Sequence, residues 1–188
     1  MAAEASVPPR PGMGAGRARL AEILRVDHAG ELAAVQIYRG QRAVFAAAPG
    51  KDGVARDIAA MGEQEERHLA AFDALLTAQS VRPSLLSPVW RAAGFALGAA
   101  TALMGEKAAH ACTEAVENVI EQHYAAQIEE LKDREPELSA SLAQYRDEEL
   151  EHRDHAVEQG AQDAPAHGLL SAVIGAGCRA AIRIAQRV

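Results

Sequence analysis

The chain has 188 residues, of which 49% are hydrophobic, enough for one domain with a substantial core. Only 4% of the residues are aromatic, proline is scarce and alanine is abundant, a composition that favours helices throughout. The net charge of −7 argues against nucleic acid as a partner. We therefore expect an all-α protein that acts on something other than nucleic acid.

Residues 1–18 are rich in proline, glycine and alanine and have no apolar periodicity, so we expect a disordered leader followed by a single domain over residues 19–188. The leader lacks the apolar stretch of a secretory signal. Its arginines leave open a remnant of a mitochondrial transit peptide. A plain bacterial cytoplasmic N-terminus is the simpler interpretation.

Two helices are expected next, over residues 20–47 and 53–79, because Pro49-Gly50 and Arg82-Pro83 are helix-ending sequences. On the first helix, Glu31 faces inward with no basic residue one turn away on that face, although a surface glutamate is the alternative. On the second helix, Glu65 and His68 fall on an apolar face. The other members of that face are Val54, Ile58, Met61, Phe72 and Leu75.

An apolar, glycine-rich segment follows at residues 85–105. Its length approaches that of a membrane span, but Pro88, Arg91 and the weakly apolar alanines and glycines argue against a stable transmembrane helix. We expect a segment that lies on a bilayer or covers an apolar pocket.

Two further helices are expected over residues 106–132 and 137–159, the second starting after Pro136. Glu149 and His152 repeat the Glu-x-x-His spacing of the second helix and also lie on an apolar face. One such motif is expected by chance in a chain so rich in glutamate, but two on buried faces are informative. An uncompensated buried carboxylate is costly and normally takes up a proton or binds a cation.

Glu117 is the best inward acid of the third long helix, because the chain resembles a diverged tandem repeat. Glu31 precedes Glu65 by 34 positions, and Glu117 precedes Glu149 by 32. The two halves are offset by 86 positions for the first pair and 84 for the second. Each half thus supplies one lone glutamate and one Glu-x-x-His motif.

The chain ends with an apolar helix over residues 168–188 that carries Arg179, Arg183 and Arg187. One interpretation is a helix docked on the bundle with cations near its C-terminus. The other is an amphipathic helix whose arginines reach anionic headgroups. The two interpretations are compatible with each other.

Two lone glutamates and two Glu-x-x-His motifs on four helices are typical of a dinuclear iron or manganese site inside a ferritin-like bundle. Four carboxylates and two neutral imidazoles offset the charge of two divalent ions, and oxygen-rich ligation suits iron. Zinc usually takes fewer ligands and some sulfur. The expected fold is a ferritin-like four-helix bundle with two additional apolar, membrane-associating helices.

The chain resembles the demethoxyubiquinone hydroxylases of ubiquinone biosynthesis over nearly all of its length after the leader. The matching segments are RVDHAGELAAVQIYRGQ from Arg25, EQEERHLAAF from Glu63, ACTEAVENVIEQHYAAQI from Ala111, RDEELEHRDHA from Arg146 and AGCRAAIRIAQRV from Ala176. The resemblance implies two iron ions per chain, in the Fe2+ and Fe3+ states, and carries the family's ligands onto the six positions that the periodicity selects: Glu31, Glu65, His68, Glu117, Glu149 and His152.

The resemblance also places His123 and Tyr124 near the substrate, where they would orient a ligand, relay electrons or protons, or contact the quinone ring; satisfied core residues are the alternative. Where some relatives have a second glutamate after the ligand, this sequence has Asn118, which leaves the ligand set intact.

The implied activity is that of a monooxygenase, a 3-demethoxyubiquinol 3-hydroxylase type oxidoreductase that hydroxylates the ring of a demethoxyubiquinone or demethoxyubiquinol with O2 and two electrons. The alternatives are a ferritin-type iron-binding or ferroxidase protein and a purely structural bundle. A storage protein has no evident use for two extra apolar helices, and a structural bundle has none for six buried ligands.

The implied partners are a polyprenylated quinone, an electron donor, a membrane surface, a lipid-binding accessory protein of ubiquinone biosynthesis and further copies of the chain. The expected location is peripheral, on the cytoplasmic face of a bacterial inner membrane, with the matrix face of the mitochondrial inner membrane as the alternative.

Overall fold

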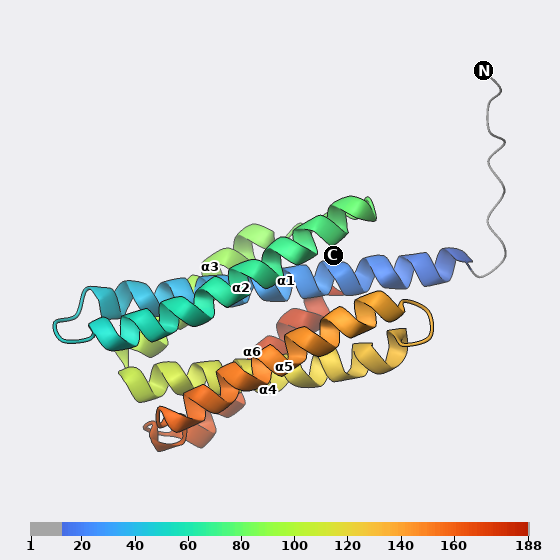
Figure 1. Cartoon of the computed structure of the whole chain (residues 1–188). Helices are drawn as coiled ribbons and strands as arrows, with labels where there is room; N and C mark the ends of the chain where they lie inside the picture. Colours follow the sequence, from blue (N-terminus) through green and yellow to red (C-terminus); the bar gives the residue numbers. More distant parts are fainter. Residues whose placement is uncertain (1–12, 188) are drawn as a thin grey trace, which may run out of the picture.

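A computed structural model describes residues 13–187, and this part of the chain is all-α (Figure 1). The helices are α1 (Met13–Ala46), α2 (Asp52–Ala78), α3 (Ser87–Leu103), α4 (Glu106–Leu131), α5 (Pro136–Glu158) and α6 (His167–Ala185). A short 3-10 helix, η1 (Ala161–Asp163), connects α5 to α6. The predicted all-α class is therefore confirmed, and the helix ends lie close to the expected positions.

The start of α1 is the main correction. The leader was expected to extend to residue 18 and the helix to begin near Leu20, but α1 begins at Met13. Extending a helix that is already nucleated costs little per residue, and Ala15, Arg17 and Ala18 favour it despite two glycines. The rest of the expected leader, residues 1–12, lies outside the described residues.

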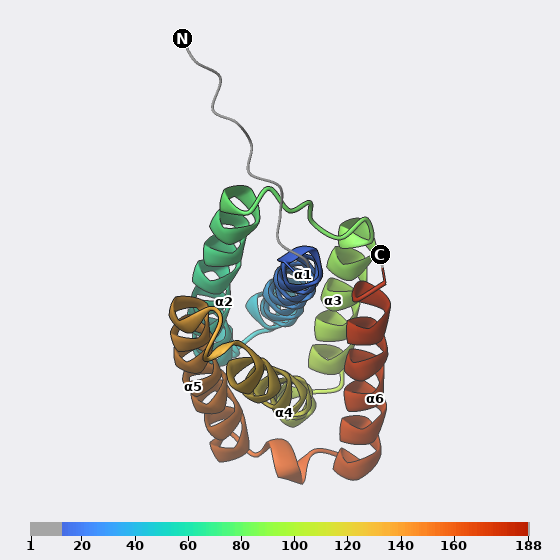
Figure 2. The same cartoon turned by 90° about the vertical axis from the view of Figure 1, so that its right-hand side faces the viewer.

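Helices α1 and α2 form one antiparallel pair and α4 and α5 form another, and the two pairs face each other as a ferritin-like four-helix bundle (Figure 2). One apolar layer joins all four helices and contains Ile23, Leu24, Phe72, Leu76, Tyr124, Leu131 and Leu142. A second layer lies further along the bundle and contains Tyr38, Phe45, Ala55, Ile58, Met61, Ala102 and Ala109. In α1, α2 and α4 the predicted ligands lie between these two layers in the sequence, and in α5 they follow Leu142 of the first layer.

Helix α3 packs on α1 at very short range because glycines remove the side chains between the two backbones. A Cβ atom on Gly98 would lie 2.0 Å from the carbonyl oxygen of Ile37, and one on Gly94 would lie 2.5 Å from that of Ala33. From the other side, a Cβ atom on Gly40 would lie 2.3 Å from the carbonyl oxygen of Phe95. Only glycine fits at these contacts without a backbone shift.

Helix α6 packs mainly on α4 and touches α1, so that α3 and α6 lie on the same side of the bundle (Figure 2). By length and composition α6 is the one helix of residues 13–187 that is long and apolar enough to cross a membrane, with a mean hydropathy of 1.4 and 17% of the tested window buried. Much of its apolar surface therefore faces away from the bundle.

Candidate metal centre

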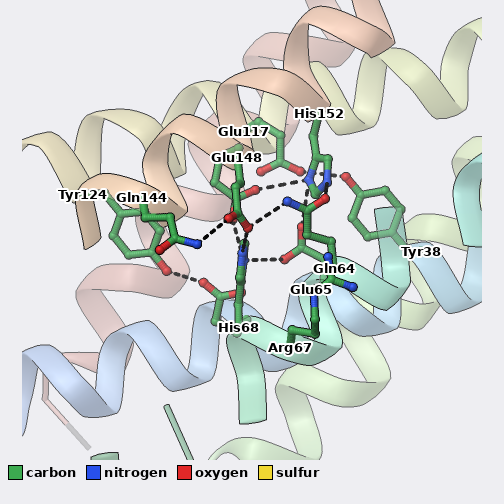
Figure 3. A network of polar contacts seen from close by, with 12 residues as sticks. Tyr38, Gln64, Glu65, Arg67, His68, Glu117, Tyr124, Gln144, Glu148 and His152 are labelled. Carbon is green, nitrogen blue, oxygen red and sulfur yellow. Dashed lines mark hydrogen bonds and ion pairs between the residues drawn. The ribbon is translucent and has the colours of Figure 1, made fainter. Parts of the chain in front are cut away.

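Six buried side chains from four helices converge at the middle of the bundle (Figure 3). Helix α1 supplies Glu31, α2 supplies Glu65 and His68, α4 supplies Glu117, and α5 supplies Glu149 and His152. They form two groups of four, in each of which one ligand atom per residue lies within 4.8 Å of the others. Glu65 and Glu149 belong to both groups.

The two groups have the same composition. One adds Glu31 and His68 to the shared pair, and the other adds Glu117 and His152. Glu65 and Glu149 are shared, so both groups of four draw on the same two carboxylates. The arrangement is compatible with metal binding.

Both imidazoles direct Nδ1 at these carboxylates. Nδ1 of His68 lies 3.2 Å from Oε1 of Glu149 and 3.6 Å from Oε2 of Glu31. Nδ1 of His152 lies 3.0 Å from Oε1 of Glu65 and 3.4 Å from Oε2 of Glu149. The spacing of three residues in Glu-x-x-His puts each imidazole above the carboxylate of its own helix, as the helix repeat requires.

The hydrogen-bond inventory fits a metal site. Buried atoms without a hydrogen-bond partner occur in all six residues: Oε2 of Glu31, both carboxylate oxygens of Glu65, Nδ1 of His68, Oε2 of Glu117, both carboxylate oxygens of Glu149 and Nδ1 of His152. Buried polar atoms in folded proteins are otherwise nearly always paired. The donor set, four carboxylates and two imidazoles, suits a hard, redox-active cation such as iron.

The pKa values of these groups show how strongly the site favours positive charge. Burial raises the pKa of Glu31, and it raises the pKa of Glu65 and Glu117 well above the usual value. Burial opposes the charge of His68 as well, but the nearby carboxylates of Glu149 and Glu31 raise its pKa to about 12. For Glu149, the nearby imidazoles of His152 and His68 outweigh burial and lower the pKa to about 2. Divalent cations compete with protons for such a site.

Glu148, beside the ligand Glu149, holds the outer nitrogen of His68. Nε2 of His68 lies 2.6 Å from Oε2 of Glu148, and the amide groups of Gln64 and Gln144 donate to the same carboxylate at 2.7 and 2.8 Å (Figure 3). Metal-binding histidines are commonly fixed in this way by a carboxylate on the second ring nitrogen. Hydrogen bonds from Gln144, Gln64 and His68 outweigh partial burial and lower the pKa of Glu148 to about 2.

Two buried tyrosines bind the two lone glutamates, Glu117 and Glu31. The hydroxyl of Tyr38 donates to Oε1 of Glu117 at 3.0 Å, and the hydroxyl of Tyr124 donates to Oε1 of Glu31. Each tyrosine therefore binds the lone glutamate of the opposite half of the chain. Of the two residues expected near the substrate, Tyr124 contacts a predicted ligand directly.

His123 lies one position away but points at a different carboxylate. Its Nε2 lies 3.2 Å from Oδ1 of Asp27, and the amide nitrogen of Gln127 donates to the same oxygen at 2.8 Å. Burial raises the pKa of Asp27, and the hydrogen bonds from His123 and Gln127 oppose that rise. The structure thus places His123 beside Asp27 and not among the six clustered residues.

Two adjoining cavities lead from the side of α3 and α6 toward this region. The outer cavity, of about 90 Å³, is almost wholly apolar and includes Trp90 of α3 and Cys178 and Ala181 of α6 in its lining. The inner cavity, of about 40 Å³, is lined by Asp27, Glu31, His123, Tyr124 and four residues that also line the outer one. These shared residues are Val26, Gly30, Ile120 and Ile182. The apolar outer cavity therefore adjoins a smaller cavity whose lining includes Glu31 and Asp27.

A family model described as ubiquinone biosynthesis protein COQ7 matches residues 18–185. The chain belongs to this family. Its relatives include a 3-demethoxyubiquinol 3-hydroxylase of Rhodospirillum rubrum, 49% identical over 178 residues that cover 95% of this chain and 82% of the relative. The mitochondrial NADPH-dependent 3-demethoxyubiquinone 3-hydroxylase of Homo sapiens is 46% identical over 176 residues, covering 92% and 79%. The mitochondrial 5-demethoxyubiquinone hydroxylase of Saccharomyces cerevisiae is 39% identical over 185 residues, covering 90% and 78%.

Membership of the COQ7 family confirms the predicted resemblance. The sequence interpretation missed Tyr38 as a partner of Glu117, Glu148 as the partner of His68 and Gln64 as the partner of His152. The tandem repeat carries a usable signal for them: Tyr124 follows Tyr38 by 86 positions, the offset of Glu31 and Glu117. Glu148 follows Gln64 by 84 positions, the offset of Glu65 and Glu149. Equivalent positions of the two halves meet around the centre.

Proposed function

We propose that this COQ7-family protein hydroxylates the ring of a demethoxyubiquinol or demethoxyubiquinone precursor, using O2 and two electrons, as a step of ubiquinone biosynthesis. The observation that carries the proposal is a buried set of four carboxylates and two imidazoles beside two adjoining, mostly apolar cavities, which would form an apolar path to it. The names of its relatives support the same reaction rather than iron storage. A ferroxidase or storage bundle has no use for the apolar path.

Six residues would hold two iron ions per chain. Glu31 and His68 would bind one ion, Glu117 and His152 the other, and Glu65 and Glu149 would bridge them. Bound iron would supply the redox chemistry that activates O2. The protein's part is to orient the ligands: Glu148 fixes His68, and the phenol of Tyr124 fixes Glu31.

The substrate would enter by the apolar path. The outer cavity matches an isoprenoid tail because its lining is almost wholly apolar. The inner cavity is also mostly apolar, but its lining includes Asp27, Glu31 and His123, which would meet the oxygens of the ring. A substituted ring is larger than the inner cavity, so Ile120 or Ile182, which line both cavities, must shift when it enters. His123 and Tyr124 would then border the ring, in agreement with the role expected from the family resemblance.

We further propose that the protein works at a membrane surface. Every large hydrophobic side chain that is exposed within residues 13–187 lies in α3, in α6 or beside α3: Leu85, Val89, Phe95, Leu103, Met104, Leu169, Val173 and Ile184. Exposed apolar surface of this kind on one side of a molecule is typical of a docking surface. The same two helices border the outer cavity, so a bilayer on this side would deliver the tail directly.

Liposome binding tests the membrane proposal. Replacing Leu169 and Val173 together by glutamate should lower binding by at least about tenfold, since burying one such side chain contributes about 1.5–3 kcal/mol. Ala60→Glu, on the exposed face of α2, is the control and should bind as the unchanged protein does. Arg179 and Arg183 would attract an anionic leaflet, so binding should weaken in salt. Equal binding by all three proteins would contradict the proposal.

The proposed partners are a polyprenylated quinone, an electron donor, a lipid-binding accessory protein of ubiquinone biosynthesis and further copies of the chain. A nicotinamide nucleotide is the favoured donor, because relatives are named as NADPH-dependent. Relatives include bacterial and mitochondrial proteins, which leaves the cytoplasmic face of a bacterial inner membrane and the matrix face of the mitochondrial inner membrane as the proposed locations.

Substituting Glu149 by Ala tests the proposed reaction, because Glu149 belongs to both ligand groups. The unchanged protein should load about two Fe2+ per chain and convert a demethoxyquinol to the hydroxylated product with a reductant and O2. Glu149→Ala should lose dinuclear loading and turnover together, while Glu151→Ala, at an exposed position of the same helix, should keep both. Normal iron content and turnover in Glu149→Ala would refute the assignment, and hundreds of irons per assembly would favour storage.

A further inference from the structure

Asp27 is a buried carboxylate that lies outside the six clustered residues and has one oxygen unused. It is 3% exposed, and its Oδ1 is held by His123 and Gln127 of α4. Its Oδ2 is buried and has no hydrogen-bond partner within the described part of the chain. Leaving a buried carboxylate oxygen unpaired is costly, so an unpaired Oδ2 indicates a ligand that supplies a donor.

The position of Asp27 matches the path proposed for the substrate. Asp27 precedes Glu31 by one helical turn, and both residues line the inner cavity with His123 and Tyr124. Side chains four residues apart on a helix have Cβ atoms roughly 5–6 Å apart. A group bound to Asp27 therefore lies next to the candidate metal centre, on the side of Glu31.

The internal repeat shows that the carboxylate of Asp27 and the imidazole of His123 occur in only one of the two equivalent places. Adding the offset of 86 to position 27 gives Thr113, and subtracting it from position 123 gives Ile37. Around the six clustered residues the two halves match closely, as Tyr38 and Tyr124 show. The Asp27–His123 pair has no such counterpart. A requirement of the metal ligands would apply to both halves, so the pair serves something that approaches one side only.

We propose that Asp27 binds a ring hydroxyl group of the reduced, quinol form of the substrate and so selects the quinol over the quinone. This inference rests on the proposed function. Gln127 donates to Oδ1, and His123 donates to it as well in the tautomer that carries a proton on Nε2, so an ionised Asp27 keeps Oδ2 as an acceptor only. A quinol hydroxyl donates to such an oxygen, whereas a quinone carbonyl, itself an acceptor, leaves both oxygens unpaired. Recognition of a hydroxyl by a buried polar group discriminates strongly against analogues that lack the donor.

The test measures binding without turnover. The iron-loaded full chain is titrated without O2, using a demethoxyquinol with a short isoprenoid tail and the matching demethoxyquinone as probes. Trp90, the one tryptophan of the sequence, lines the outer cavity and reports binding by fluorescence. The unchanged protein should bind the quinol at least about tenfold more tightly than the quinone, the size expected for a hydrogen bond to a charged group.

Asp27→Asn should remove that preference, because an amide in place of Oδ2 donates to a carbonyl and cannot accept from a hydroxyl. Quinol affinity should fall at least about tenfold while quinone affinity stays equal or rises. Asp73→Asn is the matched control: Asp73 pairs with His28 at 3.0 Å, with 63% of its side chain exposed and outside both cavities. It should keep the preference of the unchanged protein.

Equal affinity of the unchanged protein for both probes, together with normal hydroxylation, would overturn the inference about Asp27 and leave the proposed function standing. Loss of preference in both variants alike would also overturn it. If the unchanged protein binds neither probe and forms no product, the proposed function fails and the inference with it. Iron content and a melting curve show whether Asp27→Asn folds. If it does not, the affinities of the unchanged protein for the two probes decide whether the quinol is preferred.

Discussion

Tyr38 and Tyr124 occupy equivalent positions in the two halves of the chain. Removing either phenol group should lower the melting temperature by a similar amount, but only the loss of the Tyr124 phenol should strongly lower turnover. Each phenol is fully buried and donates to the lone glutamate of the other half, Glu117 and Glu31 respectively. Burial raises the pKa of both phenols well above the usual value, so both keep the proton that they donate. Only Tyr124 lines the inner cavity.

Substituting either tyrosine by phenylalanine removes one hydrogen bond to a buried carboxylate without changing the ring. A hydrogen bond to a charged group contributes about 1.5–3 kcal/mol. For a protein of this size each kcal/mol lowers the melting temperature by roughly 2–4 °C. Tyr38→Phe and Tyr124→Phe should therefore melt about 3–12 °C below the unchanged protein, by similar amounts.

Turnover should separate the two variants, because Tyr124 also borders the proposed ring site. Tyr124→Phe should lose at least about tenfold in kcat/KM for a demethoxyquinol, the equivalent of one lost hydrogen bond of about 1.4 kcal/mol in the transition state. Tyr38→Phe should stay within a few-fold of the unchanged protein. Iron content, melting temperature and steady-state kinetics are measured on the same preparations. If Tyr38→Phe loses as much turnover as Tyr124→Phe at equal iron content, the substrate does not approach from the Glu31 side.

Two further predictions concern the packing of α3 and the protons of the metal centre. Gly98→Ala should destabilise the fold by about 1–3 kcal/mol, because its Cβ would lie 2.0 Å from the carbonyl oxygen of Ile37. Gly177→Ala is the control, because a Cβ there has no neighbour within 4 Å, and it should stabilise the fold by about 0.5–1 kcal/mol. Urea unfolding measures both variants, and an equal free energy of unfolding for the two would contradict the packing argument. Fe2+ loading at neutral pH should release protons, because the raised pKa values of His68 and Glu65 mean that the metal displaces them. The affinity for Fe2+ should therefore fall as the pH is lowered, and a pH-independent affinity with no dye-detected proton release would contradict this.

The helices and the inward faces could be predicted from the sequence because both depend on local periodicity. The spacing of Glu65 and His68 on an apolar face is a property of one helix and needs no knowledge of its neighbours. The extra turns at the start of α1 were missed because Gly14 and Gly16 lie there and prolines precede them, while helix extension depends on the turns that follow.

Contacts between helices could not be predicted in this way, since they depend on how faces meet. The periodicity of α1 allows either Asp27 or His28 on its inward face and does not choose between them. Both are buried, and they point to different neighbours: Asp27 to His123 of α4 and His28 to Asp73 of α2. Likewise, the glycines of α3 give no sequence signal for a backbone contact as short as that between Gly98 and Ile37.

The repeat predicted for two helix pairs extends to a third helix in each half. Helix α3 follows α2 and packs on α1, and α6 follows α5 and packs on α4, so the chain is built twice from two long helices and one shorter apolar helix (Figure 2). A two-fold arrangement explains why the six clustered residues form two groups of equal composition. It also means that symmetry alone gives a substrate no preferred side. The departures from symmetry, the Asp27–His123 pair and the inner cavity beside Glu31, lie together on the side that α3 and α6 border. We therefore attribute the ligand set to the repeat and the direction of substrate approach to its divergence.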